Sequence, residues 1–329
     1  MTIASKLSKK YGERYYNKTY PNPTVERTGI PGLDIILGGG IPNGRIIQIV
    51  GQSSSCKTTL SLHIAKNYID NGHEVGFVDC ESTLTDDRLN EIQISKDKFH
   101  LFLPSDGADA LNFAFDILEA GAKLVIIDSV PMLISQKVVN NEVGQLAIAP
   151  QARLLSQEQH HIIQACYTSN GTIIFINQMR QSIGSYGNPN IATGGKALQY
   201  MCSSIIETRR SDVAKDGSGV NIIAKTTKNK LTSANQSTEF FVDFPLAVID
   251  KFSSMKDALE KKKLIIRGGS FFNFREDLKL KFGQEKSIQG GKGVVDFLRN
   301  NPECYNFLYD LVLEDCMERS LIPEELDLE

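Results

Sequence analysis

The sequence lacks three features that would place the chain in a membrane, a secretory pathway or a metal-binding class. It has no stretch of about 18 consecutive apolar residues, the length that a membrane-spanning helix needs. Its amino terminus has no apolar signal-peptide segment. Its six cysteines form no CxxC pair, which argues against a structural zinc site and a disulfide framework. These absences predict a soluble, cytoplasmic protein with reduced thiols and no membrane contact.

A strong excess of positive charge is also absent. The net charge is −3 and the isoelectric point is about 6.0, so the chain as a whole is not a polycation. A nucleic-acid site would therefore have to be a local patch. The 329 residues are enough for one large domain and a smaller one, with a sizeable buried core.

The most informative stretch runs from Arg45 to Glu81. Arg45–Val50 is a short apolar run with the character of a buried strand, and apolar residues then recur at helical spacing. Between them, Gly51–Thr58 has the spacing G-x-x-x-x-x-K-T, and Val75–Val78 follows as a second strand. Strand, glycine-containing loop, helix and strand form the context that a phosphate-binding loop requires.

This loop predicts ATP and Mg²⁺ as cofactors. Backbone N–H groups around Ser53–Lys57 would bind phosphate oxygens. Lys57 would reach the β- and γ-phosphates, and Thr58 would ligate Mg²⁺. Cys56 stands where the usual pattern has glycine, and we interpret it as a tolerated variant. The alternative is a degenerate loop that no longer binds nucleotide. The predicted ATP-binding residues of the loop are Gly51, Gln52, Ser53, Ser54, Ser55, Cys56, Lys57, Thr58 and Thr59.

Strands and helices alternate after the loop, which predicts an α/β fold with a mostly parallel sheet covered on both faces. The expected strands are Phe99–Leu103, Lys123–Asp128 and Gly171–Asn177, with helices at 85–95 and Ala108–Ala120. In such sheets, ligands bind at the carboxyl ends of the strands.

Three polar residues fall at those carboxyl ends. Asp128 follows an apolar run and is expected to hold the Mg²⁺ shell. Glu81 is the expected general base that activates a water molecule. Gln178 is placed to sense the γ-phosphate. For both acids, a capping or surface carboxylate is the alternative interpretation.

Two polar segments are candidates for nucleic-acid contact. Met179–Leu198 carries four glycines and Arg180 but no acidic residue, which favours a loop that follows a polynucleotide backbone. Gln136–Leu146, which precedes the helix that carries Arg153, is less basic. An ordinary mobile surface loop is the alternative.

Together these stretches resemble the RecA family of ATP-dependent DNA strand-exchange recombinases, in its bacterial and phage branch. The resemblance covers most of the chain. It is carried by GQSSSCKTT, FVDCE, LVIIDS, FINQMRQSIG, GNPNIATGGKAL and KTTKNK. It implies a RecA-like ATPase core that hydrolyses ATP and forms a helical filament on single-stranded DNA. It also implies strand exchange with double-stranded DNA in recombination, repair and the SOS response.

The resemblance also implies roles for individual residues. Glu81, Lys57 and Gln178 would be catalytic, with Gln178 as the γ-phosphate switch. Gln136–Leu146 and Met179–Gly195 would be the two DNA-binding loops. Residues expected to contact DNA are Arg153, Arg180, Ile183, Gly194 and Gly195. Residues expected at the subunit interface are Lys228 and Lys230, which would reach the ATP of the adjacent subunit, and Tyr200.

Three departures from the family pattern indicate a divergent member. Cys56 replaces the loop glycine. Arg88 stands where the family has an aromatic ring against adenine, although an Arg plane can also stack. The first DNA loop lacks the usual acid- and glycine-rich sequence.

The resemblance and composition predict three units: an N-terminal docking helix or arm (1–27), the ATPase core (28–250) and a small α+β C-terminal domain (251–329). Residues 251–287 contain ten Lys or Arg against five Asp or Glu, which favours contact with duplex DNA. A solvated helical face is the alternative. Residues 314–329 carry seven acids and one Arg, and this tail could compete with DNA for the basic patch.

Two other functions stay open. The stretch TGIPGLDIILGGGIPNG is also at home in hexameric motors and clock-type ATPases of the same fold. The substitution at Cys56 keeps open a DNA-binding scaffold that binds ATP but scarcely hydrolyses it.

Overall fold

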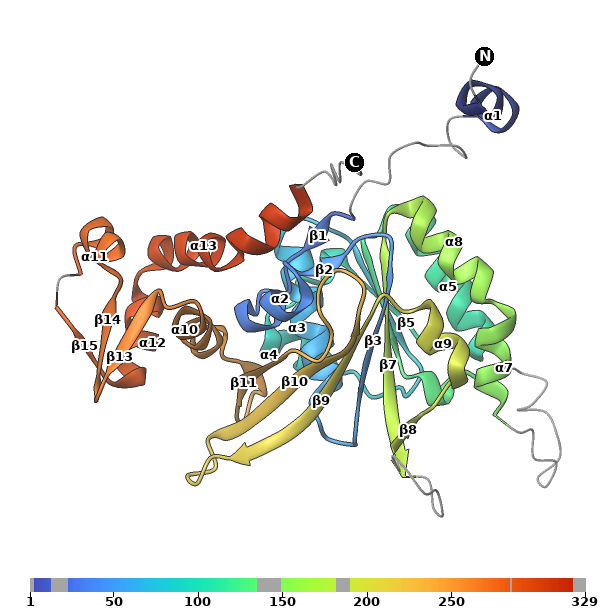
Figure 1. Cartoon of the computed structure of the whole chain (residues 1–329). Helices are drawn as coiled ribbons and strands as arrows, with labels where there is room; N and C mark the ends of the chain where they lie inside the picture. The colour runs from blue at the N-terminus through green and yellow to red at the C-terminus, as the bar shows by residue number, and fades with distance from the viewer. Residues whose placement is uncertain (1–2, 13–22, 135–148, 182–189, 285, 322–329) are drawn as a thin grey trace.

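The computed structural model describes residues 3–12, 23–134, 149–181, 190–284 and 286–321 (Figure 1). A central sheet has helices on both faces, and a smaller C-terminal part follows at one side. Within these residues, no helix is long and apolar enough to cross a membrane.

The central sheet has ten strands in the order β12-β11-β10-β9-β3-β7-β6-β4-β5, with β8 paired to β7. Its strands are β3 Ile46–Gly51, β4 Val75–Asp79, β5 Phe99–Phe102, β6 Leu124–Asp128, β7 Thr172–Gln181, β8 Asn190–Ala192, β9 Ser204–Val213, β10 Gly219–Asn229, β11 Ser237–Asp243 and β12 Val248–Ile249. Strands β9, β3, β7, β6, β4 and β5 run parallel, whereas β10, β11 and β12 continue the sheet in antiparallel pairs. The predicted α/β fold with a mostly parallel sheet is confirmed.

Helices cover both faces of this sheet and create two hydrophobic clusters. The core helices are α2 Pro31–Leu37, α3 Lys57–Asp70, α4 Asp86–Ile92, α5 Gly107–Glu119, α7 Pro150–Gln157, α8 Gln159–Ser169 and α9 Gly195–Met201. One cluster lies under α2 and α3 and contains Leu60 and Tyr68; the other lies under α5 and α8 and contains Leu111 and Ile162. Every residue of β3 is buried because both faces are covered, which explains why Gln48 is the one polar side chain among its six residues.

The C-terminal part has a third hydrophobic cluster, built from α10, a small sheet and the last helices. Its elements are α10 Lys251–Lys261, β13 Ile265–Gly268, β14 Phe271–Phe274, α11 Glu276–Phe282, β15 Ile288–Gln289, α12 Gly290–Asn300 and α13 Pro302–Leu321. Helices α10 and α13 pack against α2 of the core. At this junction the Tyr309 hydroxyl donates a hydrogen bond to the buried carboxylate of Asp34.

The amino-terminal elements are α1 Ile3–Tyr11 and the short pair β1 Val25–Glu26 with β2 Ile41–Pro42. Figure 1 shows α1 apart from the core. The strand expected at Gly171–Asn177 is longer in the structure, where β7 runs to Gln181 because its extension pairs with β8. Strand β9 and the antiparallel strands β10 to β12 were not anticipated from the sequence.

Candidate functional site

The predicted phosphate loop connects β3 to α3 at the carboxyl edge of the sheet. A side chain at Gly51 would place its Cβ 2.4 Å from the Ser55 Oγ and from the Thr208 backbone oxygen, so only glycine fits there. Cys56 adopts φ 60° and ψ 29°, the left-handed conformation in which glycine is usual. The Cys56 side chain packs against the cluster under α3, so the loop accommodates a cysteine at this position.

Lys57 and Thr58 begin α3 and face the end of β6. The Lys57 Nζ donates to the backbone oxygen of Gln52 at 2.7 Å, across the loop. Burial lowers the pKa of Lys57, an effect that the charges of Asp128 and Glu81 oppose. The Thr58 hydroxyl donates to Asp128 Oδ2 at 2.6 Å. Burial raises the pKa of Asp128 from 3.8 to about 6, and the nearby acidic side chains add to this shift.

Glu81 lies beside this pair and is held by two further groups. Its Oε1 accepts a hydrogen bond from the Ser129 hydroxyl at 2.5 Å and a longer one from Gln178 Nε2 at 3.4 Å. Asp79 positions the segment, since its carboxylate accepts from the backbone N–H groups of Glu81 (3.2 Å) and Leu84 (2.8 Å). The structure therefore brings Lys57, Asp128, Glu81 and Gln178 together. Ser129 and Asp79 were missed, although each stands within two residues of a predicted acid in the sequence.

The protein side chains at this site could bind a magnesium ion only if a bound nucleotide and water supplied further oxygen donors. In the described ranges, no group of three His, Cys, Asp or Glu side chains could hold a metal ion. Thr58 and Asp128 supply one hydroxyl and one carboxylate, both oxygen donors of the type that Mg²⁺ prefers. Phosphate oxygens and water would have to complete the shell, as in phosphate-loop sites generally.

A chain of hydrogen bonds links the sensor position to the glycine pair. The Gln178 backbone N–H donates to Asn177 Oδ1 at 2.8 Å, and Asn177 Nδ2 donates to the Thr193 backbone oxygen at 2.6 Å. Thr193 directly precedes Gly194, the residue that caps the start of α9. Sequence reasoning missed Asn177, which lies at the end of the predicted strand. Asn177 therefore connects the backbone of Gln178 to the segment that precedes α9.

Gly194 and Gly195 pack closely against the α7 side of the core. Both have positive φ, at 90° and 71°. A Cβ at Gly194 would lie 2.9 Å from Val130 Cγ1, and one at Gly195 would lie 3.0 Å from Ala152 Cβ. Arg153, the next residue of α7, is exposed. The structure thus brings the glycine pair close to the helix that carries Arg153.

Arg88 connects α4 to α3 and to the connection between β11 and β12. Its guanidinium donates to the Thr59 hydroxyl (3.3 Å), to the backbone oxygens of Leu246 and Ala247 (3.0 Å for Ala247), and to Glu91 at 3.0 Å. The side chain thus borders the first turn of α3. The Arg88 side chain already makes hydrogen bonds to four residues. To stack on an adenine base, as the sequence analysis considered, it would have to break some of these bonds.

Lys228, Lys230 and Tyr200 lie away from the phosphate loop of the same chain. Lys228 pairs with Ile205 near the start of β9, whereas the first loop residue pairs with Thr208 further along that strand. The Lys228 ammonium donates to backbone oxygens at the end of α9, including that of Tyr200 at 3.1 Å. Tyr200 is 67% exposed. Within one chain, these residues do not join the site.

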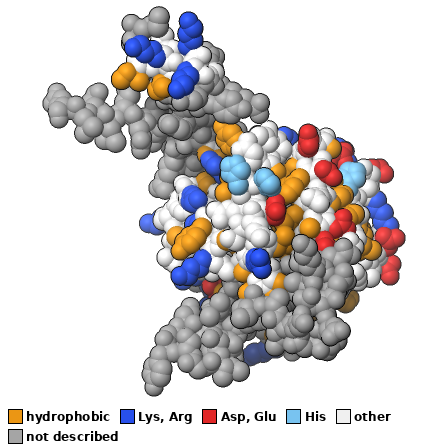
Figure 2. Space-filling model, turned by 90° about the vertical axis from the view of Figure 1, so that its right-hand side faces the viewer, with side chains coloured by type: hydrophobic (Ala, Val, Ile, Leu, Met, Phe, Trp, Pro, Cys, Tyr) orange, Lys and Arg blue, Asp and Glu red, His pale blue; other side chains and the backbone are white. Residues whose placement is uncertain are grey.

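The face that carries α5 and α8 shows acidic, basic and hydrophobic side chains interspersed over its described surface (Figure 2). Ile163 and Tyr167 of α8 are exposed there. The predicted DNA contacts at Arg180 and at the glycine pair lie elsewhere, toward the carboxyl edge of the sheet. Arg180 belongs to β7 at that edge. Ile183 and the predicted loop Gln136–Leu146 lie outside the described residues.

The fold and this site define an α/β protein with a phosphate-binding loop. Residues 5–247 match the protein family described as "RecA N-terminal domain". "Protein RecA" of Cutibacterium acnes is 32% identical over 337 residues, covering 99% of this chain and 94% of that protein. "Protein RecA" of Rickettsia bellii (strain RML369-C) is 33% identical over 320 residues, covering 94% of this chain and 91% of that protein.

The chain belongs to the RecA family, as the sequence resemblance predicted. Membership of this family implies nucleotide binding. A solved structure titled "Crystal structure of the RadB recombinase" superposes with a TM-score of 0.54 at 21% identity, covering 68% of this chain and 98% of that one. This second likeness concerns the fold alone.

Proposed function

We propose that this protein is an ATP-dependent DNA recombinase that hydrolyses ATP when bound to DNA. The observation that carries the proposal is the meeting of Lys57, Thr58, Asp128, Glu81 and Gln178 at one edge of the sheet, in a chain of the RecA family. A recombinase of this kind requires that nucleotide binding changes the affinity of the protein for DNA. The hydrogen bonds from Gln178 through Asn177 to the segment before Gly194 supply a route for that signal.

We assign the chemistry as follows. The loop N–H groups and Lys57 bind the triphosphate, while Thr58 and Asp128 hold Mg²⁺, which would neutralise phosphate charge. Glu81 accepts a proton from the attacking water, and Ser129 keeps its carboxylate in place. Gln178 changes partner when a γ-phosphate is present, because its bond to Glu81 is long at 3.4 Å and easily replaced.

We propose that neighbouring subunits complete the nucleotide site. Lys228 and Lys230 lie on the side of the sheet remote from their own phosphate loop, and Tyr200 is exposed beside Lys228. A contact between these residues and the loop of the next subunit would be head-to-tail, and such a contact generates a helical filament when it does not close. The arm 1–27, the core 28–250 and the domain 251–329 would be the units of each protomer.

We propose that single-stranded DNA binds at the carboxyl edge, near Arg153, Arg180, Ile183, Gly194 and Gly195. The glycine pair stands next to α7 with Gly195 exposed, so backbone groups there are accessible to phosphates. The basic C-terminal domain would collect double-stranded DNA for pairing. The segments at the carboxyl edge would then hold the single strand while it is tested for pairing with the duplex.

The test is DNA binding with and without ATP and Mg²⁺, measured by fluorescence anisotropy of a labelled single-stranded oligonucleotide. Wild-type protein should bind at least tenfold more tightly with ATP, and Lys57→Ala should lose that gain. Lys66→Ala, on the same helix, is the matched control and should behave as wild type, because Lys66 pairs with Asp70 at the surface.

Hydrolysis and assembly separate this function from its rivals. DNA-stimulated phosphate release that disappears in Glu81→Gln supports catalysis, whereas equal release in both proteins contradicts the assigned role of Glu81. Electron micrographs should show helical filaments on DNA. Closed rings, or DNA affinity that ignores nucleotide, would refute the recombinase proposal.

A further inference from the structure

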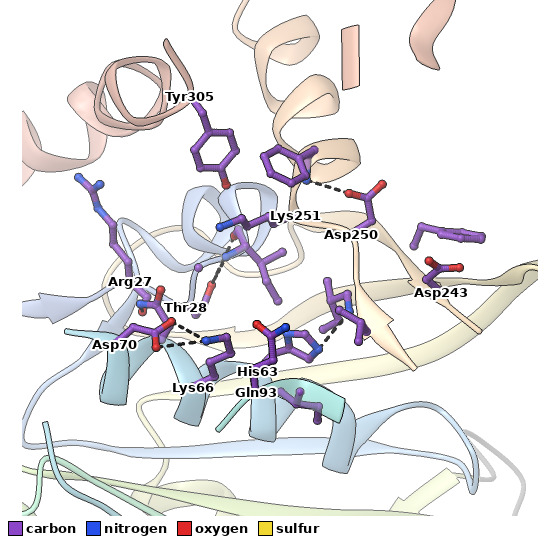
Figure 3. A pocket seen from close by; sticks show the side chains of 18 of the residues that line it. Arg27, Thr28, His63, Lys66, Asp70, Gln93, Asp243, Asp250, Lys251 and Tyr305 are labelled. Carbon is purple, nitrogen blue, oxygen red and sulfur yellow. Dashed lines mark hydrogen bonds and ion pairs between the residues drawn. The ribbon is translucent and has the colours of Figure 1, made fainter. Parts of the chain in front are cut away.

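A cavity of about 760 Å³ lies between the core and the C-terminal part. Figure 3 shows its walls: α3 with His63 and Lys66 on one side, and Lys251 and Tyr305 of the C-terminal part on the other. None of the residues Gly51–Thr59 lines it, so the cavity is separate from the phosphate loop. Its volume is in the range of small-molecule sites, which often occur between domains.

One polar group in the wall lacks a partner. Tyr305 is 5% exposed, and its hydroxyl makes no hydrogen bond to any group of the described chain. Tyr309, one turn further along α13, satisfies its own hydroxyl by donating to Asp34. A buried hydroxyl without a partner destabilises the folded state, and a ligand that accepts its hydrogen bond removes that cost. Figure 3 shows the Tyr305 hydroxyl directed toward Lys251.

Lys251 is the uncommitted cation of this wall. Its ammonium lies 5.4 Å from the centroid of the Tyr305 ring and 5.5 Å from that of Phe252, and it has no carboxylate partner among the described residues. Most other charges in the wall are already paired. Lys66 pairs with Asp70 at 2.9 Å, and Arg27 pairs with Asp310 at 2.8 Å. The Asp250 carboxylate accepts a hydrogen bond from the Phe252 backbone N–H at 3.1 Å, in the first turn of α10.

The remaining charged groups of the wall include Glu91, which pairs with Arg88 at 3.0 Å. Arg299 lies 3.9 Å from both Asp250 and Asp296 and over the Phe252 ring, which adds a second cation to this side. Asp243 lies on the opposite side of the view in Figure 3. Burial lowers the pKa of His63 to about 4, and its Nε2 accepts from the Ile249 backbone N–H at 3.0 Å. His63 is therefore a neutral, fixed part of the wall at physiological pH.

We propose that this cavity binds a small organic anion with a flat apolar body. Its acidic group would accept hydrogen bonds from the Tyr305 hydroxyl and the Lys251 ammonium. Its body would pack against Phe252 and Ile249, which are the apolar surfaces next to that pair. Because the walls come from both the core and the C-terminal part, the bound anion holds the two together.

The test uses 1-anilinonaphthalene-8-sulfonate as an aromatic anion and its uncharged analogue N-phenyl-1-naphthylamine as the matched probe. Isothermal titration is run on the full-length protein with saturating ATP and Mg²⁺, and repeated with Lys57→Ala. The sulfonate should bind at one site per chain in both proteins, and the uncharged probe about tenfold more weakly or worse. Binding that survives Lys57→Ala is independent of the proposed nucleotide site.

Three variants locate the site. Lys251→Met and Tyr305→Phe should each weaken sulfonate binding, by about tenfold for Lys251→Met because it removes a charge-assisted hydrogen bond. Lys66→Met is the control within the same cavity and should change binding less than threefold, since its ammonium is committed to Asp70. Lys251 is exposed and Tyr305→Phe removes an unpartnered hydroxyl, so both variants should fold. Equal affinity of both probes, or unchanged binding in Lys251→Met and Tyr305→Phe, would overturn the proposal.

Discussion

Replacing Asp128 with Asn should make the nucleotide-free protein more stable while it abolishes function. Asp128 is 6% exposed, and burial raises its pKa from 3.8 to about 6. Keeping this carboxylate ionised in the folded chain at pH 7 therefore costs about 3 kcal/mol. Asparagine carries no charge and keeps an oxygen that can accept the hydrogen bond from Thr58. The folded state of Asp128→Asn avoids the cost.

The gain should depend on pH in a definite direction. A carboxyl group whose folded pKa lies above its unfolded pKa binds more protons when folded, so it weakens the fold as the pH rises from 3.8 to about 6. The advantage of Asp128→Asn should be about 3 kcal/mol at pH 7 and roughly half of that at pH 5. Urea unfolding followed by circular dichroism, without nucleotide or Mg²⁺, measures both values.

Asp70→Asn is the control, because Asp70 is an exposed partner of Lys66 on α3. It should change stability by about 0–1 kcal/mol with little dependence on pH. In the same preparation of Asp128→Asn, Mg²⁺-dependent ATP hydrolysis should fall roughly 100-fold, since a metal ligand is lost. A destabilised Asp128→Asn protein, or a gain that does not change between pH 5 and pH 7, would refute the reasoning.

Three further predictions concern the loop, the glycine pair and the domain junction. Cys56→Gly, at φ 60°, should keep ATP affinity within about threefold or improve it, because glycine adopts this conformation without cost; a tenfold loss in a nucleotide titration would contradict this. Gly194→Ala should lower stability in a thermal melt by about 1–3 kcal/mol, since its Cβ would meet Val130 at 2.9 Å; an unchanged midpoint would show that the packing is looser than described. Tyr309→Phe should cost about 1–3 kcal/mol in urea unfolding, because Asp34 loses a hydrogen bond that lowers its pKa. In the wild-type protein burial raises the pKa of Asp34 to about 7, and losing the Tyr309 bond should raise it further. The stability loss should therefore grow between pH 6 and pH 8, and a loss that shrinks over that range would exclude the explanation.

The local elements of the nucleotide site could be predicted from the sequence. A short apolar strand, a loop of fixed spacing and a helix that begins at Lys57 are encoded by neighbouring residues, so periodicity and spacing reveal them. Asp128 could be placed for the same reason, as the polar end of a fully buried strand. Parallel strands present their carboxyl ends at one edge, and from this rule the approach of Glu81 to Gln178 was predicted across 97 positions.

The groups that hold these residues, and the extent of the sheet, could not be predicted and are seen only in the folded chain. Ser129 and Asp79 were not predicted as the partners that fix Glu81, since a hydroxyl next to an acid has no distinctive spacing. Strands β10 and β11 are buried largely on alternate residues, a weaker signal than the fully buried and mostly apolar strand β3. The bond between Tyr309 and Asp34 joins residues 275 positions apart, and the cavity beside it exists only because the C-terminal part packs on α2. Such contacts depend on the relative placement of whole elements, which side-chain packing sets and local sequence does not record.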